Sequence, residues 1–319
     1  MEIDHPQVAR AVELVGAGRD AEALPILARL AGEGNGEALF FLGDAYWRGI
    51  GAPQDYGRGR ELFRQAAERG HPMAVRAYTN LLGSGIAGPR DWQGALKRLR
   101  EEARGDALRA TMLALIEKMP IDAQGDPLSL PKGERVSEVP LVVLFPGAFT
   151  REECGYLVQI AEPTFQPSLV ANPEKGDVRD PIRTSDGSTM HWLIEDPVVH
   201  AVNRRLAALS GTRADQGEPL QILRYRPGQE YRRHLDWLGV DKPRVLTALI
   251  YLNEDYGGGE TDFPKAGFKV RGRTGDALIF RSVQPDGSID RMSEHAGLPV
   301  TKGAKYLGSR WIRPHRHTV

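Results

Sequence analysis

The sequence predicts an α+β protein in which an array of helical repeats precedes a β-rich domain of the jelly-roll type. The region from Ala21 to about Met119 is rich in Ala, Leu, Glu and Arg, and its apolar residues recur at helical spacing. The same region repeats itself at a fixed step, as helical arrays do. From Pro140 onward the pattern changes to short β-branched or aromatic runs separated by Gly, Pro and Asp, which is typical of strands.

The helical region has a period of 36 residues. Small, turn and apolar residues recur at this step: Ala38, Gly49, Ile50, Asp55 and Phe63 are followed by Ala74, Gly85, Ile86, Asp91 and Leu99. We expect the turns GIGAPQD and GIAGPRD to join the helices of each pair, with Asp55 and Asp91 as N-caps. The stretch ALFFLGDAYWRGIGAPQDYGRGRELFRQAAERGH resembles the Sel-one-like variety of tetratricopeptide repeat. Such repeats imply either a protein-docking surface or a cap that stabilises the following domain.

A polar segment that carries Pro and Gly, PIDAQGDPLSLPKGERVSE, separates the two kinds of pattern. It predicts a linker or an extended arm. We therefore expect a helical repeat domain in residues 1–120, a linker in 121–138 and a second domain in 139–319.

The second domain is expected to contain strands with two supporting helices. The strand-like runs are PLVVLF, LQILRY, VLTALIYLN, FKV, DALIF and SRWI. One helix follows Thr150 as its N-cap, and another follows Asp196, with Pro197 at its first position and Gly211 beyond its end. Strand-rich sequence after two helices favours an antiparallel double sheet with helices on one face.

The overall charge excludes some classes of partner. Lys plus Arg equals Asp plus Glu at 42 each, so no global field would recruit nucleic acid or an anionic membrane. The sequence contains no run of about 18 apolar residues, so it predicts no membrane span. The acidic opening does not resemble a signal peptide, and the single cysteine, Cys154, fits a reducing compartment. We expect a cytoplasmic protein.

Three residues point to a metal site. His234 and Asp236 stand two apart, so on a strand both side chains project from the same face, and His295 is the obvious third ligand. Two imidazoles and one carboxylate, with other positions left open, suit non-haem Fe(II) and O₂ chemistry. Taken alone, the segment YRRHLD favours an interpretation of His234 as a surface histidine.

Six ordered stretches then carry a specific resemblance: RTSDG, LQILRYRPGQEYRRHLDWL, RVLTALIYLNEDYGGGETDFP, GDALIF, PDGSIDRMSEHAGLPVTKGAKY and SRWI. From about Val139 to Ile312 the chain resembles the prolyl 4-hydroxylase branch of the Fe(II)- and 2-oxoglutarate-dependent oxygenases. The resemblance implies a double-stranded β-helix fold, with His234, Asp236 and His295 holding Fe(II). It also implies 2-oxoglutarate and O₂ as cosubstrates, with ascorbate as the accompanying reductant.

The resemblance assigns further residues to the two sides of the site. Lys305 would pair with the distal carboxylate of 2-oxoglutarate, which Tyr225 and Thr261 would also bind. The residues expected around a target proline are Arg183, Tyr231, Arg244 and Trp311. For Trp311, a place in the core of the strand is an equally good interpretation.

The expected activity is hydroxylation of a prolyl residue in a peptide or protein, with succinate and CO₂ as products. Two alternatives stay open. One keeps the cofactors but changes the acceptor to free proline, another small molecule or a different side chain. The other is a repeat-based binding protein whose oxygenase domain is sensory or inactive.

Overall fold

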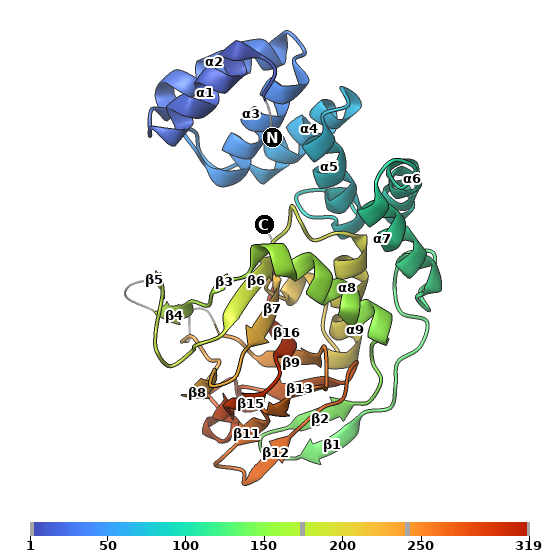
Figure 1. Cartoon of the computed structure of the whole chain (residues 1–319), viewed down its shortest axis with the longest axis vertical. Coiled ribbons are helices and arrows are strands. Elements are labelled where there is room, and N and C mark those ends of the chain that lie inside the picture. Colours follow the sequence, from blue (N-terminus) through green and yellow to red (C-terminus); the bar gives the residue numbers. More distant parts are fainter. Residues whose placement is uncertain (1–2, 173–175, 240–242, 318–319) are drawn as a thin grey trace. The chain divides into compact units, whose positions relative to one another are not determined.

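The computed structural model describes residues 3–172, 176–239 and 243–317, which form two compact units (Figure 1). The helical unit contains the residues up to Ala114 together with Trp192–Pro197. The sheet unit contains Leu115–His191 and the residues from Val198 onward. The predicted α+β class is confirmed.

The helical unit is built from consecutive helices that pack pairwise along the chain (Figure 1). They are α1 (Pro6–Gly16), α2 (Asp20–Gly32), α3 (Gly36–Arg48), α4 (Tyr56–Glu68), α5 (Pro72–Ser84) and α6 (Trp92–Glu102), followed by α7 (Ala107–Lys118), which continues into the sheet unit. The pair α5 and α6 begins 36 positions after the pair α3 and α4, as the period predicts.

The ends of these helices follow the predicted turn chemistry. The side chain of Asp55 accepts a hydrogen bond from the backbone N–H of Arg58, and Asp91 does the same for Gly94. Gly49 and Gly85 end α3 and α5 in the left-handed conformation, with φ of 72° and 74°. The two Asp N-caps are confirmed.

The sheet unit contains a large antiparallel sheet with the strand order β1-β2-β13-β9-β16-β7-β6-β3 (Figure 1). Its strands are β1 (Glu134–Ser137), β2 (Val142–Phe145), β3 (Gln166–Pro167), β6 (Asp186–Met190), β7 (Leu220–Tyr225), β9 (Leu246–Tyr251), β13 (Ala277–Arg281) and β16 (Lys305–Ile312). Each predicted strand-like run corresponds to a strand, but β16 begins four residues before SRWI, at Lys305.

A smaller antiparallel sheet has the order β12-β11-β14-β8. Its strands are β8 (Tyr231–His234), β11 (Thr261–Phe263), β12 (Phe268–Val270) and β14 (His295–Gly297). Two further pairs are β4 (Val170–Asn172) with β5 (Gly176–Val178), and β10 (Gly257–Gly258) with β15 (Val300–Lys302). The short 3₁₀ turns are Glu162–Thr164, Ala214–Gln216 and Arg291–Ser293.

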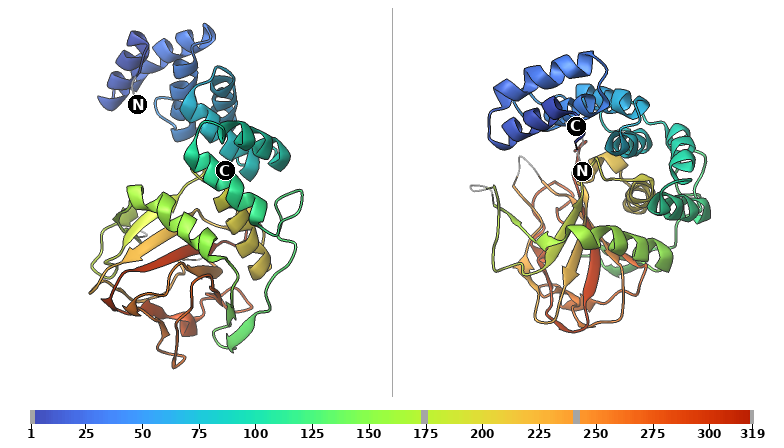
Figure 2. Two further views of the ribbon diagram at one scale, coloured as in Figure 1. Left: turned by 45° about the vertical axis from the view of Figure 1, so that its right-hand side comes forward. Right: turned by 45° about the horizontal axis from the view of Figure 1, so that its top comes forward.

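The two faces of the large sheet have different roles, because successive side chains on a strand point to opposite faces. Leu220 and Ile222 of β7 join the hydrophobic cluster formed with α8 (Arg151–Ala161) and α9 (Pro197–Ser210). Leu223 and Tyr225 point the other way, into the cluster shared with the smaller sheet. Figure 2 shows α8 and α9 against the large sheet. The helices thus leave the opposite face of the sheet for a site between the two sheets.

The helices of this unit begin where the sequence predicts. Thr150 caps α8 in a capping box with Glu153, and α9 begins at Pro197 and is followed by Gly211 in the left-handed conformation. Within the segment for which we expected a linker or arm, β1 pairs with β2 and extends the large sheet at its edge. In the part of the chain that the structure describes, no helix combines the length and hydrophobicity needed to cross a membrane.

Candidate active site

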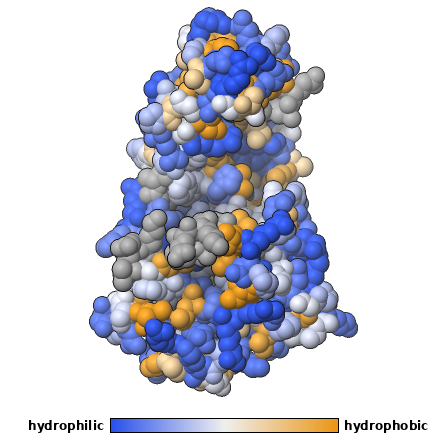
Figure 3. Space-filling model, turned by 90° about the vertical axis from the view of Figure 1, so that its left-hand side faces the viewer, coloured by the Kyte–Doolittle hydropathy of each residue, from blue (hydrophilic) through white to orange (hydrophobic). Residues whose placement is uncertain are grey.

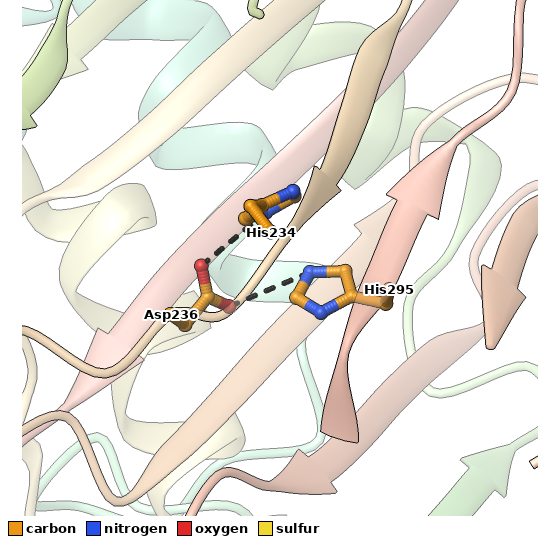
Figure 4. A group of neighbouring side chains, drawn as sticks. All are labelled: His234, Asp236 and His295. Atoms are coloured by element: carbon orange, nitrogen blue, oxygen red, sulfur yellow. Dashed lines mark ion pairs between the residues drawn. The ribbon is translucent and has the colours of Figure 1, made fainter. Parts of the chain in front are cut away.

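His234, Asp236 and His295 form a compact cluster whose ligand atoms all lie within 4.8 Å of one another (Figure 4). The Nε2 atoms of His234 and His295 each lie 3.6 Å from a different oxygen of Asp236. Asp236 and His295 are buried, whereas His234 is partly exposed. The cluster is therefore open on one side and closed on the other.

Backbone pairing brings the two histidines together. His295 at the start of β14 is the register partner of His234 at the end of β8. The spacing of His234 and Asp236 had predicted that both residues lie on a strand. The strand β8 ends at His234, so Asp236 lies just beyond it. A register shift in this pairing also places Tyr231 and His234 on one side, with ring centroids 3.5 Å apart.

Hydrogen bonds orient both imidazoles toward the cluster centre. Nδ1 of His234 lies 2.7 Å from the carbonyl oxygen of Arg232, and Nδ1 of His295 lies 3.0 Å from that of Ser293. Since a carbonyl only accepts hydrogen bonds, each Nδ1 carries the proton and each Nε2 keeps a free lone pair. This is the tautomer that coordinates a metal through Nε2.

The electrostatics of the cluster favour a neutral ring at His295 and an ionised carboxyl at Asp236. Burial, together with the neighbouring His234, lowers the pKa of His295 to about 4, so its ring is neutral at neutral pH. Burial opposes ionisation of Asp236, but its interactions with its polar neighbours, the charged Arg244 among them, hold the pKa of that carboxyl below its usual value. Two neutral imidazoles and one carboxylate are a donor set that fits a divalent iron ion.

Thr247 is a neighbour of the cluster that sequence reasoning missed. Its hydroxyl donates a 2.6 Å hydrogen bond to Oδ2 of Asp236, and its side chain is buried. On β9 it shares a face with Leu249 and Tyr251, so the alternation of VLTALIYLN places it toward the site. The alternation in the sequence thus indicated which way Thr247 points, but not that Asp236 is its hydrogen-bond partner.

Lys305 lines the same cavity as His234, Asp236 and His295. It is 2 % exposed, and its Nζ donates a 2.7 Å hydrogen bond to the carbonyl oxygen of Gly259. Gly258 and Gly259 both have positive φ, a conformation that glycine adopts without strain. Burial lowers the pKa of Lys305 to about 8, although Glu260 partly opposes this shift.

Two tyrosine rings lie near this lysine, and one of the tyrosines contacts Thr261. Tyr225 is the register partner of Lys305 on β7, and Nζ lies 5.7 Å from the ring centroid of Tyr225. Tyr251, which sequence reasoning missed, has its ring centroid at the same distance. Its hydroxyl oxygen lies 3.0 Å from that of Thr261. A buried ammonium with nearby hydroxyls is suited to a carboxylate.

Most of the predicted site residues line one cavity, together with Thr247 and several apolar residues of the large sheet. They are His234, Asp236, His295, Tyr225, Thr261, Lys305, Arg183, Tyr231 and Trp311. Arg244 does not line this cavity but an adjoining groove, to which Arg183, Tyr231 and Trp311 also contribute. The structure thus brings nine of the ten predicted site residues to one cavity and the tenth next to it.

The side chain of Arg244 is held by residues that were not predicted. It pairs with both carboxylate oxygens of Glu218 at 2.7 Å, and its guanidinium lies 4.0 Å from the ring centroid of Trp311. Arg313 reaches the same carboxylate at 2.7 Å. A local sequence motif could not have revealed the role of Glu218, because Arg244 and Arg313 lie far from it in the chain.

Comparison with known proteins agrees with an iron-dependent oxygenase site in the sheet unit and with repeats in the helical unit. The profile of the 2OG-Fe(II) oxygenase superfamily matches residues 220–313, and that of the Sel1 repeat matches residues 36–71. Probable prolyl 4-hydroxylase 3 of Arabidopsis thaliana is 33% identical over 219 residues, covering 59% of this chain and 76% of that protein. Prolyl 4-hydroxylase 1 of the same plant is 36% identical over 203 residues, covering 57% and 72%.

Two solved structures are also similar to parts of the chain. The viral collagen prolyl hydroxylase of Paramecium Bursaria Chlorella virus-1, in its 2OG complex, has 26% identity and a TM-score of 0.45, covering 54% of this chain and 95% of that one. A Sel1 repeat protein from Oxalobacter formigenes has 25% identity and a TM-score of 0.32, covering 34% and 47%. On the sequence matches, the chain belongs to the prolyl 4-hydroxylase family of 2-oxoglutarate- and Fe(II)-dependent oxygenases.

Proposed function

We propose that this protein is an Fe(II)- and 2-oxoglutarate-dependent dioxygenase that hydroxylates a prolyl residue in a peptide or protein. One observation carries the proposal: the His234, Asp236 and His295 cluster and the buried Lys305 line a single cavity that Tyr231 and Trp311 also line. The plant relatives named prolyl 4-hydroxylases support the choice of a prolyl acceptor.

In this proposal His234, Asp236 and His295 would hold the iron. When bound, Fe(II) with 2-oxoglutarate and O₂ supplies the oxidising chemistry that turns a C–H bond into C–OH, with succinate and CO₂ as co-products. Lys305 would pair with the distal carboxylate of 2-oxoglutarate, and Tyr225 and Thr261 would add hydrogen bonds to it. In this arrangement the iron cluster and Lys305 would bind the two ends of the cosubstrate and so set its orientation.

The residues on the groove side would position the acceptor. The aromatic rings of Tyr231 and Trp311 offer apolar walls that suit a pyrrolidine ring. Burial raises the pKa of the Tyr231 hydroxyl, so it stays protonated and can donate a hydrogen bond. Arg244, whose guanidinium pairs with Glu218, would donate a hydrogen bond to a peptide carbonyl.

The activity is tested by incubating the full chain with Fe(II), ascorbate, 2-oxoglutarate and proline-containing peptides. We expect peptide-dependent succinate and a peptide product with one added oxygen, and we expect omission of ascorbate to shorten the period of turnover. Free proline and peptides without proline form the comparison series. Absence of both coupled and uncoupled succinate formation, in protein that has bound iron, would exclude the proposal.

We further propose that the Sel1-type repeats help to dock a protein substrate. Met73 is 45% exposed at the start of α5 and lines a cavity of the helical unit together with Glu37 and Arg69. Met73→Glu should then lower kcat/KM for a protein substrate but leave a short peptide unaffected. Equal effects, or none, on the two substrates would favour a purely stabilising role for the repeats.

A further inference from the structure

The groove beside the iron cluster carries an excess of positive charge. Its charged lining residues are three arginines, Arg183, Arg244 and Arg313, and one carboxylate, Glu218. Glu218 is shared between Arg244 and Arg313, since it pairs with both at 2.7 Å. One carboxylate therefore faces three guanidinium groups, and the described lining has a net charge of about two positive units.

Arg183 is the arginine whose charge Glu218 does not offset. It is 6% exposed, and its hydrogen bonds go to two neutral acceptors at 3.3 Å, the carbonyl oxygen of Leu169 and the side-chain oxygen of Gln221. Among the residues that the structure describes, no carboxylate lies within ion-pair distance of this guanidinium. A buried cation without an anionic partner is unfavourable, so an anion that entered the site would bind strongly.

Two buried donors in this region are still unused. The Nε atom of Arg183 and the Nε1 atom of Trp311 have no hydrogen-bond partner within the described part of the chain. The Arg183 guanidinium lies 4.9 Å from the ring centroid of Tyr231 and 5.9 Å from that of Trp311. The unused donors thus belong to the two side chains that also flank the expected position of the proline ring.

The surroundings favour a polar ligand group over an apolar one. The groove is lined by three guanidinium groups, one carboxylate and several polar side chains, and on the face drawn in Figure 3 hydrophobic side chains gather in separate groups among hydrophilic ones. Arg183 lines both the cavity of the iron cluster and the groove, so a group bound to it lies next to the reacting centre. A guanidinium binds a carboxylate more strongly and more directionally than it binds a neutral amide.

We propose that the acceptor carries a carboxylate close to the target proline and that Arg183 binds this carboxylate. The inference rests on the proposed hydroxylase function and specifies the substrate class of its groove. Two sources share this chemistry: an Asp or Glu side chain next to the proline, and the α-carboxylate of a C-terminal or free proline. Trp311 would donate to the same group through its indole N–H.

Binding measurements without turnover test the proposal directly. The probes are blocked pentapeptides with one central proline, flanked by alanine or by aspartate on either side, and a matching pair that ends in proline acid or proline amide. Free proline completes the series. Affinities are measured by calorimetry on the full chain with Mn(II) and 2-oxoglutarate in the absence of O₂.

We expect a carboxylate-bearing probe to bind about tenfold to a hundredfold more tightly than its neutral counterpart, the range for hydrogen bonds to a charged group. Arg183→Gln should remove this difference, so that acidic and neutral probes bind equally well to the variant, and Arg183→Lys should keep part of it. Arg135→Gln is the control, because Arg135 is exposed on β1. The ratio of the affinities of the acidic and neutral probes is compared between the aspartate-flanked peptides and the peptides that end in proline. The pair with the larger ratio identifies the source of the carboxylate.

The proposal fails if acidic and neutral probes bind equally well, if none of the acidic probes binds, or if the preference survives in Arg183→Gln. The comparison of acid and neutral probes on the unmodified chain needs no variant and so does not depend on the folding of Arg183→Gln. A separate turnover arm distinguishes the two levels of inference. Hydroxylation of neutral peptides as fast as acidic ones rejects the carboxylate requirement alone, whereas Arg183-dependent binding without any hydroxylation rejects only the function.

Discussion

Thr247 on β9 donates a 2.6 Å hydrogen bond to Asp236, and both side chains are buried. The bond holds one carboxylate oxygen, so the carboxyl group cannot rotate freely away from the two imidazoles. Partners of this kind orient the groups that bind a metal and raise the affinity of the site.

Thr247→Val, which nearly keeps the side-chain volume, should therefore weaken Fe(II) binding by about tenfold to a hundredfold. We expect saturating iron to restore most of the turnover, because the three candidate ligands remain. The measurement is the Fe(II) dependence of succinate formation. Thr301→Val, at an exposed position of β15, is the matched control, and an unchanged iron requirement in Thr247→Val would contradict the role.

Asp236→Ala should abolish turnover while the chain stays folded. The substitution removes the one carboxylate of the cluster and leaves two neutral imidazoles, which cannot hold a divalent ion as firmly. Succinate formation, iron content and circular dichroism are measured together. Asp286→Ala, at an exposed turn, serves as the control. Near-normal activity of Asp236→Ala would reject the proposed metal site.

Local signals predicted much of the fold. The N-caps Asp55, Asp91 and Thr150 were predictable because each satisfies an N–H three residues further along the chain. The alternation within LQILRY likewise determines which side chains face the helices and which face the site. These features depend on a few neighbouring residues.

Features that depend on pairing between distant segments could not be predicted in this way. The strand β1 forms in a segment rich in polar residues because the edge of the large sheet offers β2 as a partner. The register shift between β8 and β14 brings Tyr231 against His234, although their spacing of three residues does not suit one face of a regular strand. Glu218 has no motif of its own, and its role depends on Arg244 and Arg313 arriving from other strands and loops.

The binding of 2-oxoglutarate should weaken as the pH rises through about 8. Burial lowers the pKa of Lys305 from 10.5 to about 8, so the ammonium is present below this pH and is lost above it. We expect the KM for 2-oxoglutarate to rise by up to about tenfold per pH unit above pH 8, because only the charged form pairs with the carboxylate.

The stability of the fold should change in the opposite direction over the same range. Between pH 8 and 10.5 the unfolded chain binds a proton at Lys305 that the folded chain has released, so the contribution of this group to the free energy of unfolding increases with pH. Loss of affinity at pH 9 therefore does not reflect unfolding by this group. In Lys305→Arg, whose guanidinium stays charged, the pH dependence should flatten; a pH dependence as steep as that of the unmodified chain would exclude Lys305 as its source.

Glu218→Gln should both destabilise the sheet unit and impair binding of the peptide. The side chains of Glu218 and of its two arginine partners are each only 12 to 13% exposed, so the substitution removes a shared carboxylate from two nearly buried cations. We expect the free energy of unfolding to fall on the order of 3 kcal/mol. The KM for the peptide should rise more than that for 2-oxoglutarate, since Arg244 loses the partner that holds it over Trp311.

Glu138→Gln, which breaks an exposed pair with Arg135, should cost less than about 1 kcal/mol in the same denaturant titrations. Equal losses of stability in the two variants, or a selective rise in the KM for 2-oxoglutarate, would show that Glu218 does not organise the groove.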